Sequence, residues 1–337
     1  MSNLASGAAT TSQAITITAA QLVAPRRIEL TQRELSPPGP GQVRIAVEGC
    51  GVCASNVPVW EGRPWFEYPL APGQLGHEAW GTVDSVGEAV TSLRPGERVA
   101  FLSDRAYASH DIADEQMTVP LPAALAGQPV PAEPLGCAMN IFRRSDIRAG
   151  QSVAIVGAGF LGLMLVRLAR LAGAHVIAIS RRDAALDMAR QMGAAEVIRH
   201  DDNAAVLDAI SAATGDALCD VVIEATGKQQ PLDLAARLVR VRGRLIIAGY
   251  HQDGTRQLDL QLWNWRGLDV INAHERDPGL YRRGMQEAIQ LLRSARLDPR
   301  PLYTHIYPLA QLDQALDATA DRPAGFVKAL VMMQEAA

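Results

Sequence analysis

The pattern of apolar and polar residues is most regular in the middle third of this 337-residue chain. Residues 153–156 form a short β-branched run, which is typical of a buried parallel strand. Residues 160–172 are apolar and helix-forming, and a second apolar run follows at 175–179. The succession predicts a strand, a helix and a second strand within about thirty residues.

This rhythm of strand and helix continues toward the C-terminus. Apolar residues recur at helical spacing before Gly193, and strand-like runs at 220–225 and 244–248 enclose a helical segment at 231–241. Such alternation builds a doubly wound parallel sheet, so the predicted fold class is α/β. The rhythm ends near residues 268–271. The elements expected after it are a helix at 279–296, a strand at 301–307, a helix at 309–319 and a strand at 327–332.

The first part of the chain has a different pattern, with β-rich runs and many turns. Residues 14–50 contain alternating runs on either side of the turn-forming sequence SPPGPG at 36–41. A helix that follows residues 133–137 is expected to end near residue 148. Because the chain is too long for one compact core, we expect two domains.

Composition and charge exclude several classes of function. Hydrophobic residues make up 48% of the chain and charged residues 20%, as in an ordinary soluble protein, and no apolar run reaches membrane-spanning length. The net charge of −4 argues against a general nucleic-acid binder. Residues 1–13 lack the features of a secretory signal and are expected to form a frayed leader. Four irregularly spaced cysteines indicate reduced thiols and a cytoplasmic location.

The connection between the first predicted strand and its helix has the pattern G-x-G-x-x-G. Its residues are Gly157, Ala158, Gly159, Phe160, Leu161 and Gly162. In a dinucleotide-binding loop, the first glycine permits a tight turn, the second lets the backbone approach a pyrophosphate, and the third allows close packing of helix and strand. The helix N-terminus then offers free N–H groups and a positive dipole end to the phosphates. A plain strand-to-helix turn is the weaker alternative in this context.

Three residues form a candidate metal site: Cys53, His77 and Glu133. A thiolate, an imidazole and a carboxylate, with water in the fourth position, make an open site of the kind that catalytic zinc occupies. Each residue alone has an ordinary alternative, because a cysteine can be a core residue, a histidine a satisfied polar group and a Glu-Pro pair a turn. The order of the surrounding motifs favours the metal site.

These motifs resemble those of the zinc-dependent medium-chain dehydrogenase/reductase superfamily, which contains the alcohol and polyol dehydrogenases. The resemblance covers residues 18–332 and depends on the motifs GCGVCAS, GHEAWGTVDSVG, RPGERVA, EPLGCA and VAIVGAGFLG. It implies a GroES-like, β-rich catalytic domain split between the two ends of the chain, with an inserted Rossmann domain. On this basis, residues 1–133 and 276–337 form the catalytic domain, and residues 134–275 bind the dinucleotide.

The resemblance also assigns the metal ligands. It implies that Cys53 and His77 bind one catalytic zinc ion. Glu133 matches the third ligand position, which is acidic in polyol dehydrogenases. Glu78 matches a residue that lies beside the metal and can ligate it. Cys137 is a weaker alternative to Glu133.

Two further residues match functional positions of the family. Ser55 stands where the family places the hydroxyl that passes the alcohol's proton onward, so the predicted catalytic residues are Ser55, Cys53 and His77. An ordinary loop hydroxyl is the alternative for Ser55. Lys328 matches a basic residue that contacts the cofactor pyrophosphate.

The first lobe departs from the family pattern in three places. No cysteine occurs between residues 99 and 120, so the structural zinc loop is missing and one zinc ion per chain is expected. Asn56 replaces an aspartate that usually orients the ligand histidine, which leaves less charge around the metal site. Pro58 replaces a common relay histidine and leaves the exit path of the proton open.

A fourth departure concerns the cofactor. The acidic residue that usually ends the second Rossmann strand is replaced by Ser180, and Arg181 and Arg182 follow it. An acid there binds the ribose hydroxyls of NAD, whereas a hydroxyl with guanidinium groups suits the 2′-phosphate of NADP. NADP(H) is therefore the predicted cofactor, with NAD(H) second. A solvated pair of arginines is the alternative reading.

We therefore expect a zinc-dependent, NADP(H)-preferring oxidoreductase that interconverts an alcohol and a carbonyl by hydride transfer. The alternatives are a metal-independent enoyl or quinone reductase of the same fold and a non-catalytic nucleotide-binding sensor. The expected partner is a small-molecule alcohol or carbonyl substrate, without nucleic acid or membrane. Residues 268–273 match the edge strand through which the superfamily forms homodimers or homotetramers.

Overall fold

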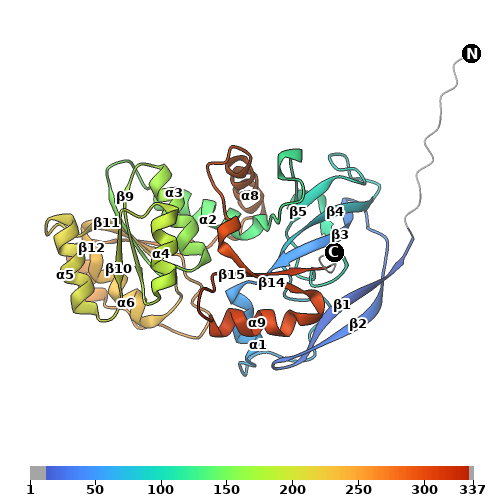
Figure 1. Ribbon diagram of the computed structural model, residues 1–337, viewed down its shortest axis with the longest axis horizontal. Coiled ribbons are helices and arrows are strands. Elements are labelled where there is room, and N and C mark those ends of the chain that lie inside the picture. The colour runs from blue at the N-terminus through green and yellow to red at the C-terminus, as the bar shows by residue number, and fades with distance from the viewer. Residues whose placement is uncertain (1–12, 334–337) are drawn as a thin grey trace, which may run out of the picture.

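The computed structural model describes residues 13–333, so the predicted leader lies almost entirely outside the described residues. Figure 1 shows an elongated molecule with a helix-covered parallel sheet at one end and a β-rich lobe at the other. Strands from both halves of the chain occur in the β-rich lobe.

The helix-covered sheet has the order β10-β9-β8-β11-β12-β13, and all of its neighbouring strands are parallel. Its strands are β8 (Ser152–Val156), β9 (His175–Ser180), β10 (Glu196–Arg199), β11 (Cys219–Glu224), β12 (Val239–Ile247) and β13 (Asp269–Asn272). Numbered from β8, this is the order 3-2-1-4-5-6 of a doubly wound sheet. The predicted α/β fold class is confirmed.

Helices cover both faces of this sheet, as the apolar pattern of β8 requires. Val153 and Ile155 of β8 belong to one apolar core, and Ala154 and Val156 belong to another on the opposite face. Because successive side chains of a strand point to opposite faces, an uninterrupted apolar run needs a cover on both sides. The helices that pack against the sheet are α3 (Phe160–Leu171), α4 (Asp183–Met192), α5 (Asn203–Thr214) and α6 (Gln229–Leu238).

The β-rich lobe contains a mixed sheet of order β14-β15-β3-β4-β5-β7. A further strand, β6, pairs with β3 in addition to this order. Its strands are β3 (Gln42–Gly51), β4 (Glu78–Val86), β5 (Arg98–Phe101), β6 (His110–Asp114), β7 (Thr118–Pro120), β14 (Tyr303–Pro308) and β15 (Lys328–Met332). A hairpin of β1 (Ile15–Ala24) and β2 (Arg27–Leu35) precedes it. β15 pairs antiparallel with β3, with Leu330 opposite Gly51. Segments from both ends of the chain thus build one sheet, whereas the domain boundaries after residues 133 and 275 stay predictions.

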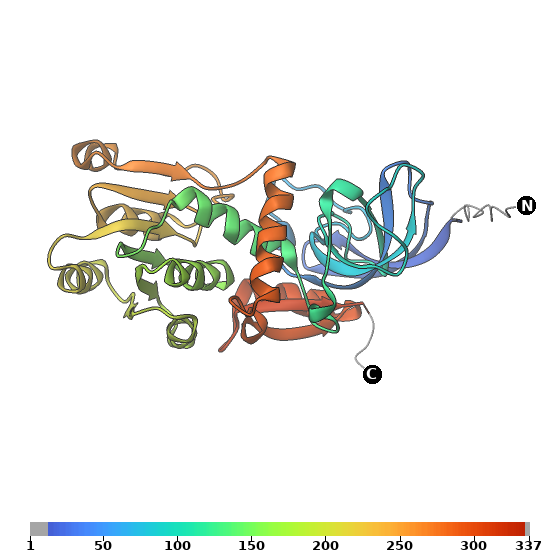
Figure 2. The same cartoon turned by 90° about the horizontal axis from the view of Figure 1, so that it is seen from above.

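Two helices lie between the lobes, α2 (Ala132–Ser145) and α8 (Pro278–Arg293). In Figure 2, α8 is the orange helix that crosses the middle of the molecule. The helices meet at two glycines: a Cβ on Gly136 would lie 2.8 Å from the backbone nitrogen of Met285, and one on Gly284 would lie 2.7 Å from the carbonyl oxygen of Gly136. The remaining α-helices among the described residues are α1 (Val57–Trp60), α7 (Leu260–Arg266) and α9 (Leu312–Asp321).

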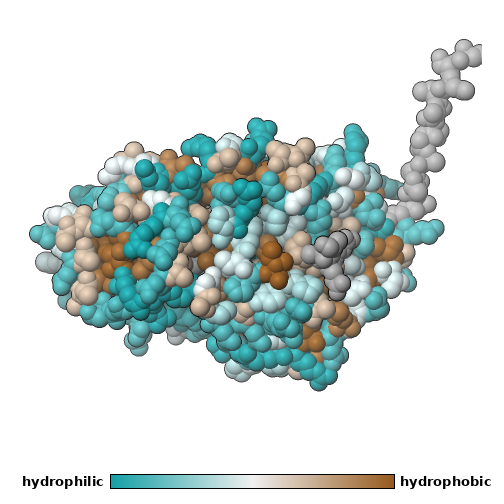
Figure 3. Space-filling model, in the orientation of Figure 1, coloured by the Kyte–Doolittle hydropathy of each residue, from teal (hydrophilic) through white to brown (hydrophobic). Residues whose placement is uncertain are grey.

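The expected elements of the C-terminal half are present, with small shifts at their ends. The helix predicted at 231–241 ends at Leu238, because the β-branched Val239 begins β12 at the next residue. Within residues 13–333, no helix combines the length and the apolar character needed to cross a membrane. Hydrophilic residues predominate on the face shown in Figure 3, where apolar residues gather in separate groups.

The segment that lacks the structural zinc loop contains a buried acid, Asp111 in β6. Its carboxylate accepts hydrogen bonds from the Ser103 hydroxyl and from the backbone N–H of Ile112. Burial nevertheless raises the pKa of Asp111 to about 6. A folded-state pKa above the unfolded value of 3.8 means that the fold loses stability as the pH rises toward 6.

We therefore predict that Asp111→Asn raises the free energy of unfolding by up to ~3 kcal/mol above pH 6, since each pKa unit corresponds to about 1.4 kcal/mol. The gain should shrink as the pH falls toward 4. Urea unfolding at pH 4.5 and pH 7.5 measures it. Asp208→Asn, at an exposed carboxylate of α5, is the matched control and should show no such difference. A gain that is equal at both pH values would contradict this origin.

Candidate functional site

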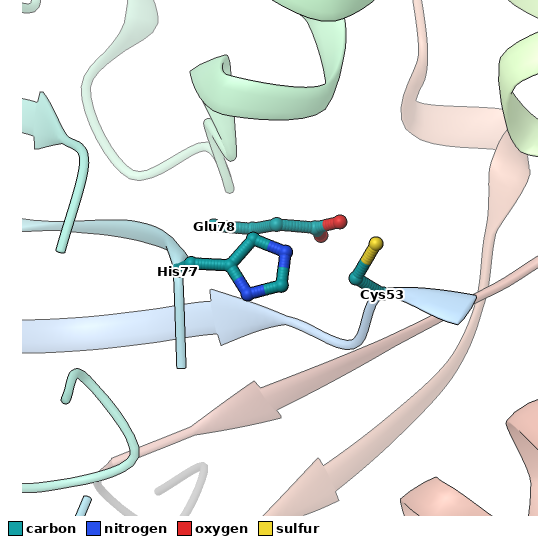
Figure 4. A group of neighbouring side chains, drawn as sticks. All are labelled: Cys53, His77 and Glu78. Carbon is teal, nitrogen blue, oxygen red and sulfur yellow. The ribbon is translucent and has the colours of Figure 1, made fainter. Parts of the chain in front are cut away.

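Three potential metal ligands come together in the β-rich lobe: Cys53, His77 and Glu78. One ligand atom from each lies within 4.8 Å of the others. Figure 4 shows the side chains pointing toward one another, with Cys53 just after β3, His77 just before β4 and Glu78 at the first residue of β4. A thiolate, an imidazole and a carboxylate suit a zinc ion.

The register of β3 and β4 brings these ligands together. Gly51, near the end of β3, lies opposite Glu78 in the sheet. A Cβ on Gly51 would lie only 1.9 Å from Oε2 of Glu78, so a glycine is needed for the carboxylate to lie across β3. Cys53 follows two residues later and accepts a hydrogen bond from the backbone N–H of Ser55 at 3.5 Å. The carboxylate and the thiol therefore approach each other above the end of β3.

The imidazole of His77 is oriented by a backbone carbonyl. Nδ1 of His77 lies 2.9 Å from the carbonyl oxygen of Leu75, a residue held at φ +82°. If Nδ1 carries the proton and donates it to this oxygen, Nε2 is the nitrogen left for a metal. Asn56 donates from Nδ2 to the same carbonyl oxygen at 3.2 Å and to the Tyr107 hydroxyl oxygen at 3.1 Å. Asn56 thus contacts the histidine's partner, not the histidine itself.

The negative groups around His77 favour a cation. Burial alone would lower the pKa of His77, but the hydrogen bond to Cys53 and the charges of Cys53, Glu133 and Glu78 raise it to about 10. The pocket therefore stabilises positive charge at this position. A bound metal ion would supply that charge.

Glu78 forms a buried ion pair with Lys328 of β15. Nζ of Lys328 donates to Oε1 of Glu78 at 2.6 Å and lies 2.5 Å from Oε2. Oε2 is fully buried, and its contact with Nζ is an ion pair without hydrogen-bond geometry. The ion-paired carboxylate stays within reach of a thiol and an imidazole, and these three groups together form a donor set that suits zinc. The residues present therefore fit a zinc ion.

Lys328 also lies against the glycine loop, because its Nζ is 5.0 Å from the centroid of the Phe160 ring. The sequence placed Lys328 at the cofactor pyrophosphate. In the structure Lys328 lies next to that loop, but its ammonium group is paired with Glu78. Contact with the pyrophosphate stays a prediction.

Glu133 lies outside the three-residue group, although its charge acts on His77. Its Oε1 accepts a hydrogen bond from the Cys137 thiol at 3.1 Å, and burial raises the pKa of Glu133. The sulfur of Cys137 in turn lies 3.4 Å from the Tyr281 hydroxyl. Glu133 therefore lies beside the group. Its hydrogen-bond partner Cys137 is the residue that the sequence analysis gave as the alternative third ligand.

Ser55 lies at the same turn as Cys53, and its hydroxyl is 3.5 Å from Oδ1 of Asn56. Pro58 is buried at the start of α1. Proton transfer by Ser55 stays a prediction, as does the path of the proton beyond it.

The glycine loop has the geometry that a pyrophosphate requires. Gly157 has φ +109°, and a Cβ there would lie 2.5 Å from Cγ2 of Thr226. A Cβ on Gly162 would lie 1.9 Å from the carbonyl oxygen of Gly157, whereas one on Gly159 would meet nothing within 4 Å. The second glycine thus faces open space, and no side chain caps the N-terminus of α3. Phe160 and Leu161 begin that helix.

Ser180 ends β9 at the same edge of the sheet, since the backbone N–H of Gly157 donates to the carbonyl oxygen of Ile179 at 2.9 Å. The Ser180 hydroxyl accepts a hydrogen bond from the backbone N–H of Arg182. The guanidinium group of Arg182 donates to the carbonyl oxygen of Phe326, and Arg181 is exposed. The structure therefore brings all three predicted residues to the expected edge.

The sequence did not identify a polar network at this edge. Glu224, fully buried at the end of β11, accepts hydrogen bonds from the backbone N–H groups of Thr226 and Gly227 and lies 3.0 Å from Nε2 of His251. Nδ1 of His251 accepts from Nε of Arg256 at 3.0 Å. An acid at the end of an otherwise apolar strand was the available signal.

Comparisons with known proteins agree with these observations. Residues 39–140 match the family model of the alcohol dehydrogenase GroES-like domain, and residues 161–294 match that of the zinc-binding dehydrogenases. Together the two models cover well over half of the chain.

Individual relatives extend over almost the whole length. An alcohol dehydrogenase from Cupriavidus necator is 28% identical, over 92% of this chain and 97% of its own. Sorbitol dehydrogenase from Gallus gallus is 26% identical, over 87% of this chain and 90% of its own. A protein of Sinorhizobium meliloti 1021, described as a zinc-binding dehydrogenase and solved with NADP, has a TM-score of 0.80 and 27% identity over 94% of this chain and 99% of its own.

The fold, the gathered residues and these relatives lead to one assignment. A GroES-like lobe with Cys53 and His77 at its centre is joined to a Rossmann sheet with a G-x-G-x-x-G loop. The chain belongs to the zinc-type medium-chain dehydrogenase/reductase superfamily, the superfamily of the alcohol and polyol dehydrogenases.

Proposed function

We propose that this protein is a zinc-dependent, NADP(H)-preferring oxidoreductase that interconverts an alcohol and a carbonyl by hydride transfer. The observation that carries the proposal is the group of Cys53, His77 and Glu78, in which one ligand atom from each residue lies within 4.8 Å of the others. The glycine loop at the edge of the Rossmann sheet supports the nucleotide half of the reaction. The metal-independent alternative gives no role to these three residues.

Each residue of the metal group has a defined part in this proposal. Cys53 would bind through Sγ, His77 through Nε2 and Glu78 through a carboxylate oxygen, while the same carboxylate stays paired with Lys328. The zinc ion supplies a Lewis acid that polarises the oxygen of the alcohol or carbonyl substrate. Glu133 is a second carboxylate near the group and is not one of the proposed ligands. This reading favours Glu78 over Glu133 as the third ligand.

The remaining residues bind the cofactor and handle the proton. Ser55 accepts the proton that the alcohol loses, and the glycine loop holds the cofactor pyrophosphate at the N-terminus of α3. Ser180, Arg181 and Arg182 bind the 2′-phosphate of NADP. One charge-assisted contact of this kind contributes ~1.5–3 kcal/mol, which corresponds to ~10–100-fold in affinity.

The relatives suggest the class of substrate and the assembly. An alcohol dehydrogenase and a sorbitol dehydrogenase are among them, so we propose a small alcohol or polyol and its carbonyl product. We also propose a homodimer or homotetramer that pairs the edge strand β13. The exposed side chain of Trp265 in α7, next to β13, is 87% accessible and would be covered there.

Removal of one proposed metal ligand tests the proposal directly. Cys53→Ala and His77→Ala should abolish NADPH-dependent reduction across a panel of aldehydes, ketones and sugars and should lower the zinc content, because a three-ligand site that loses one ligand releases its ion. Cys219→Ala, at a buried cysteine of β11, is the control and should keep both. Full activity of the Cys53 variant without zinc would favour the metal-independent alternative.

The contact between Asn56 and Leu75 provides a second test. Asn56→Ala should weaken zinc binding by ~10–100-fold, because the carbonyl that orients His77 loses its other donor. Competition with a chromophoric chelator measures this affinity, and the dissociation constant of NADPH should not change. Tyr107→Phe removes the other partner of Asn56 but leaves the contact with Leu75. If both variants weaken zinc binding equally, the effect does not pass through Leu75.

A further inference from the structure

Three arginines from two distant segments of the chain gather beside the end of β9. Arg181 and Arg182 follow β9, whereas Arg322 follows α9 in the turn that leads to β15. The sequence pointed to the first two only. Arg322 is more than a hundred residues away in the chain and belongs to the other lobe.

A hydrogen bond from the Arg182 side chain holds the turn of Arg322 against the end of β9, and backbone hydrogen bonds make that turn compact. Nη1 of Arg182 donates to the carbonyl oxygen of Phe326 at 2.7 Å. Within the turn, the backbone N–H of Phe326 donates to the carbonyl oxygen of Pro323 and that of Arg322 donates to Ala318, each at 2.9 Å. Arg322 itself has φ +50°, which turns the chain sharply at the end of α9. The compact turn therefore places Arg322 next to the β9 segment.

The guanidinium group of Arg322 lies near enough to those of Arg181 and Arg182 for their like charges to act on one another. Burial and then the charge of Arg322 lower the pKa of Arg182, and burial and then the charge of Arg181 lower the pKa of Arg322. Within residues 13–333, none of the three forms an ion pair with a carboxylate. Like charges that act on one another are unfavourable, and an anion bound between them relieves the repulsion.

We propose that Arg322 binds the 2′-phosphate of NADP(H) together with Arg181 and Arg182, so that the C-terminal segment of the catalytic lobe helps to select the cofactor. This inference rests on the NADP(H) preference proposed above. The place is right, because the ribose of a dinucleotide lies at the end of the second strand of a doubly wound sheet. A phosphate monoester carries nearly two negative charges, whereas the ribose of NAD offers only neutral hydroxyls there.

If all three arginines bind it, the 2′-phosphate of NADP(H) contacts both lobes of the protein. Arg181 and Arg182 come from the Rossmann sheet, and Arg322 comes from the segment that continues into β15 with Lys328. An anion bound by all three would neutralise the repulsion across the boundary between these segments. NADP(H) should therefore bind both lobes through its 2′-phosphate, and NAD(H) should not.

Calorimetry with two nucleotide fragments tests this without turnover or metal. 2′,5′-ADP carries the 2′-phosphate, and 5′-AMP lacks it. The wild type should bind 2′,5′-ADP at least about tenfold more tightly than 5′-AMP. Arg322→Gln should weaken binding of 2′,5′-ADP by about tenfold and leave that of 5′-AMP unchanged. Arg322→Lys should restore most of the affinity at low salt, where a point charge suffices.

Arg242→Gln is the matched control, because Arg242 is also exposed and at positive φ, with φ +56°, but lies before the carboxyl end of β12. It should change neither affinity. If the wild type prefers 2′,5′-ADP and Arg322→Gln has the affinity of the wild type, Arg322 has no part in the site, while the proposed cofactor preference stands. If the wild type binds the two fragments equally, the preference itself is wrong and this inference is wrong with it. Equal losses for both fragments would assign Arg322 a purely structural role.

Discussion

The buried ion pair between Lys328 and Glu78 is the interaction on which the rest of the site depends. It joins β15 to the first residue of β4, next to His77, and it places an ammonium group beside Phe160 of the glycine loop. Removing one partner of such a pair costs ~3–5 kcal/mol, because the other charge stays buried. The same carboxylate belongs to the group with Cys53 and His77. One contact thus connects the N-terminal and C-terminal parts of the β-rich lobe with the candidate metal group and the cofactor loop.

Much of the fold could be predicted from local patterns. The apolar runs of β8, β11 and β12 and the glycine loop at 157–162 indicate a doubly wound sheet, because period and turn chemistry are properties of short segments. The structure and the family models confirm the fold class and the superfamily. The short strand β10 and the helix α5 were not predicted individually. In α5 only Val206 and Ile210 are buried, so its apolar periodicity is weak.

The candidate site was predictable in its residue types but not in its pairings. Cys53 and His77 stand in recognisable motifs, whereas the oxygen that orients His77 belongs to the backbone of Leu75, which no side-chain pattern reveals. The partners Lys328 and Glu78 are 250 residues apart, and Arg182 and Phe326 are 144 apart. Such contacts depend on how β15 returns to β3, and that is a property of the whole fold.

The central claim is that Cys53, His77 and Glu78 bind one zinc ion through one sulfur and several nitrogen or oxygen atoms. X-ray absorption at the zinc edge of the purified, metal-replete protein, combined with elemental analysis, measures this most directly. The account predicts one zinc per chain, with a single sulfur at about 2.3 Å and the other ligands at about 2.0–2.2 Å. A protein that binds no zinc under these conditions, or a second ion surrounded by four sulfurs, would contradict it.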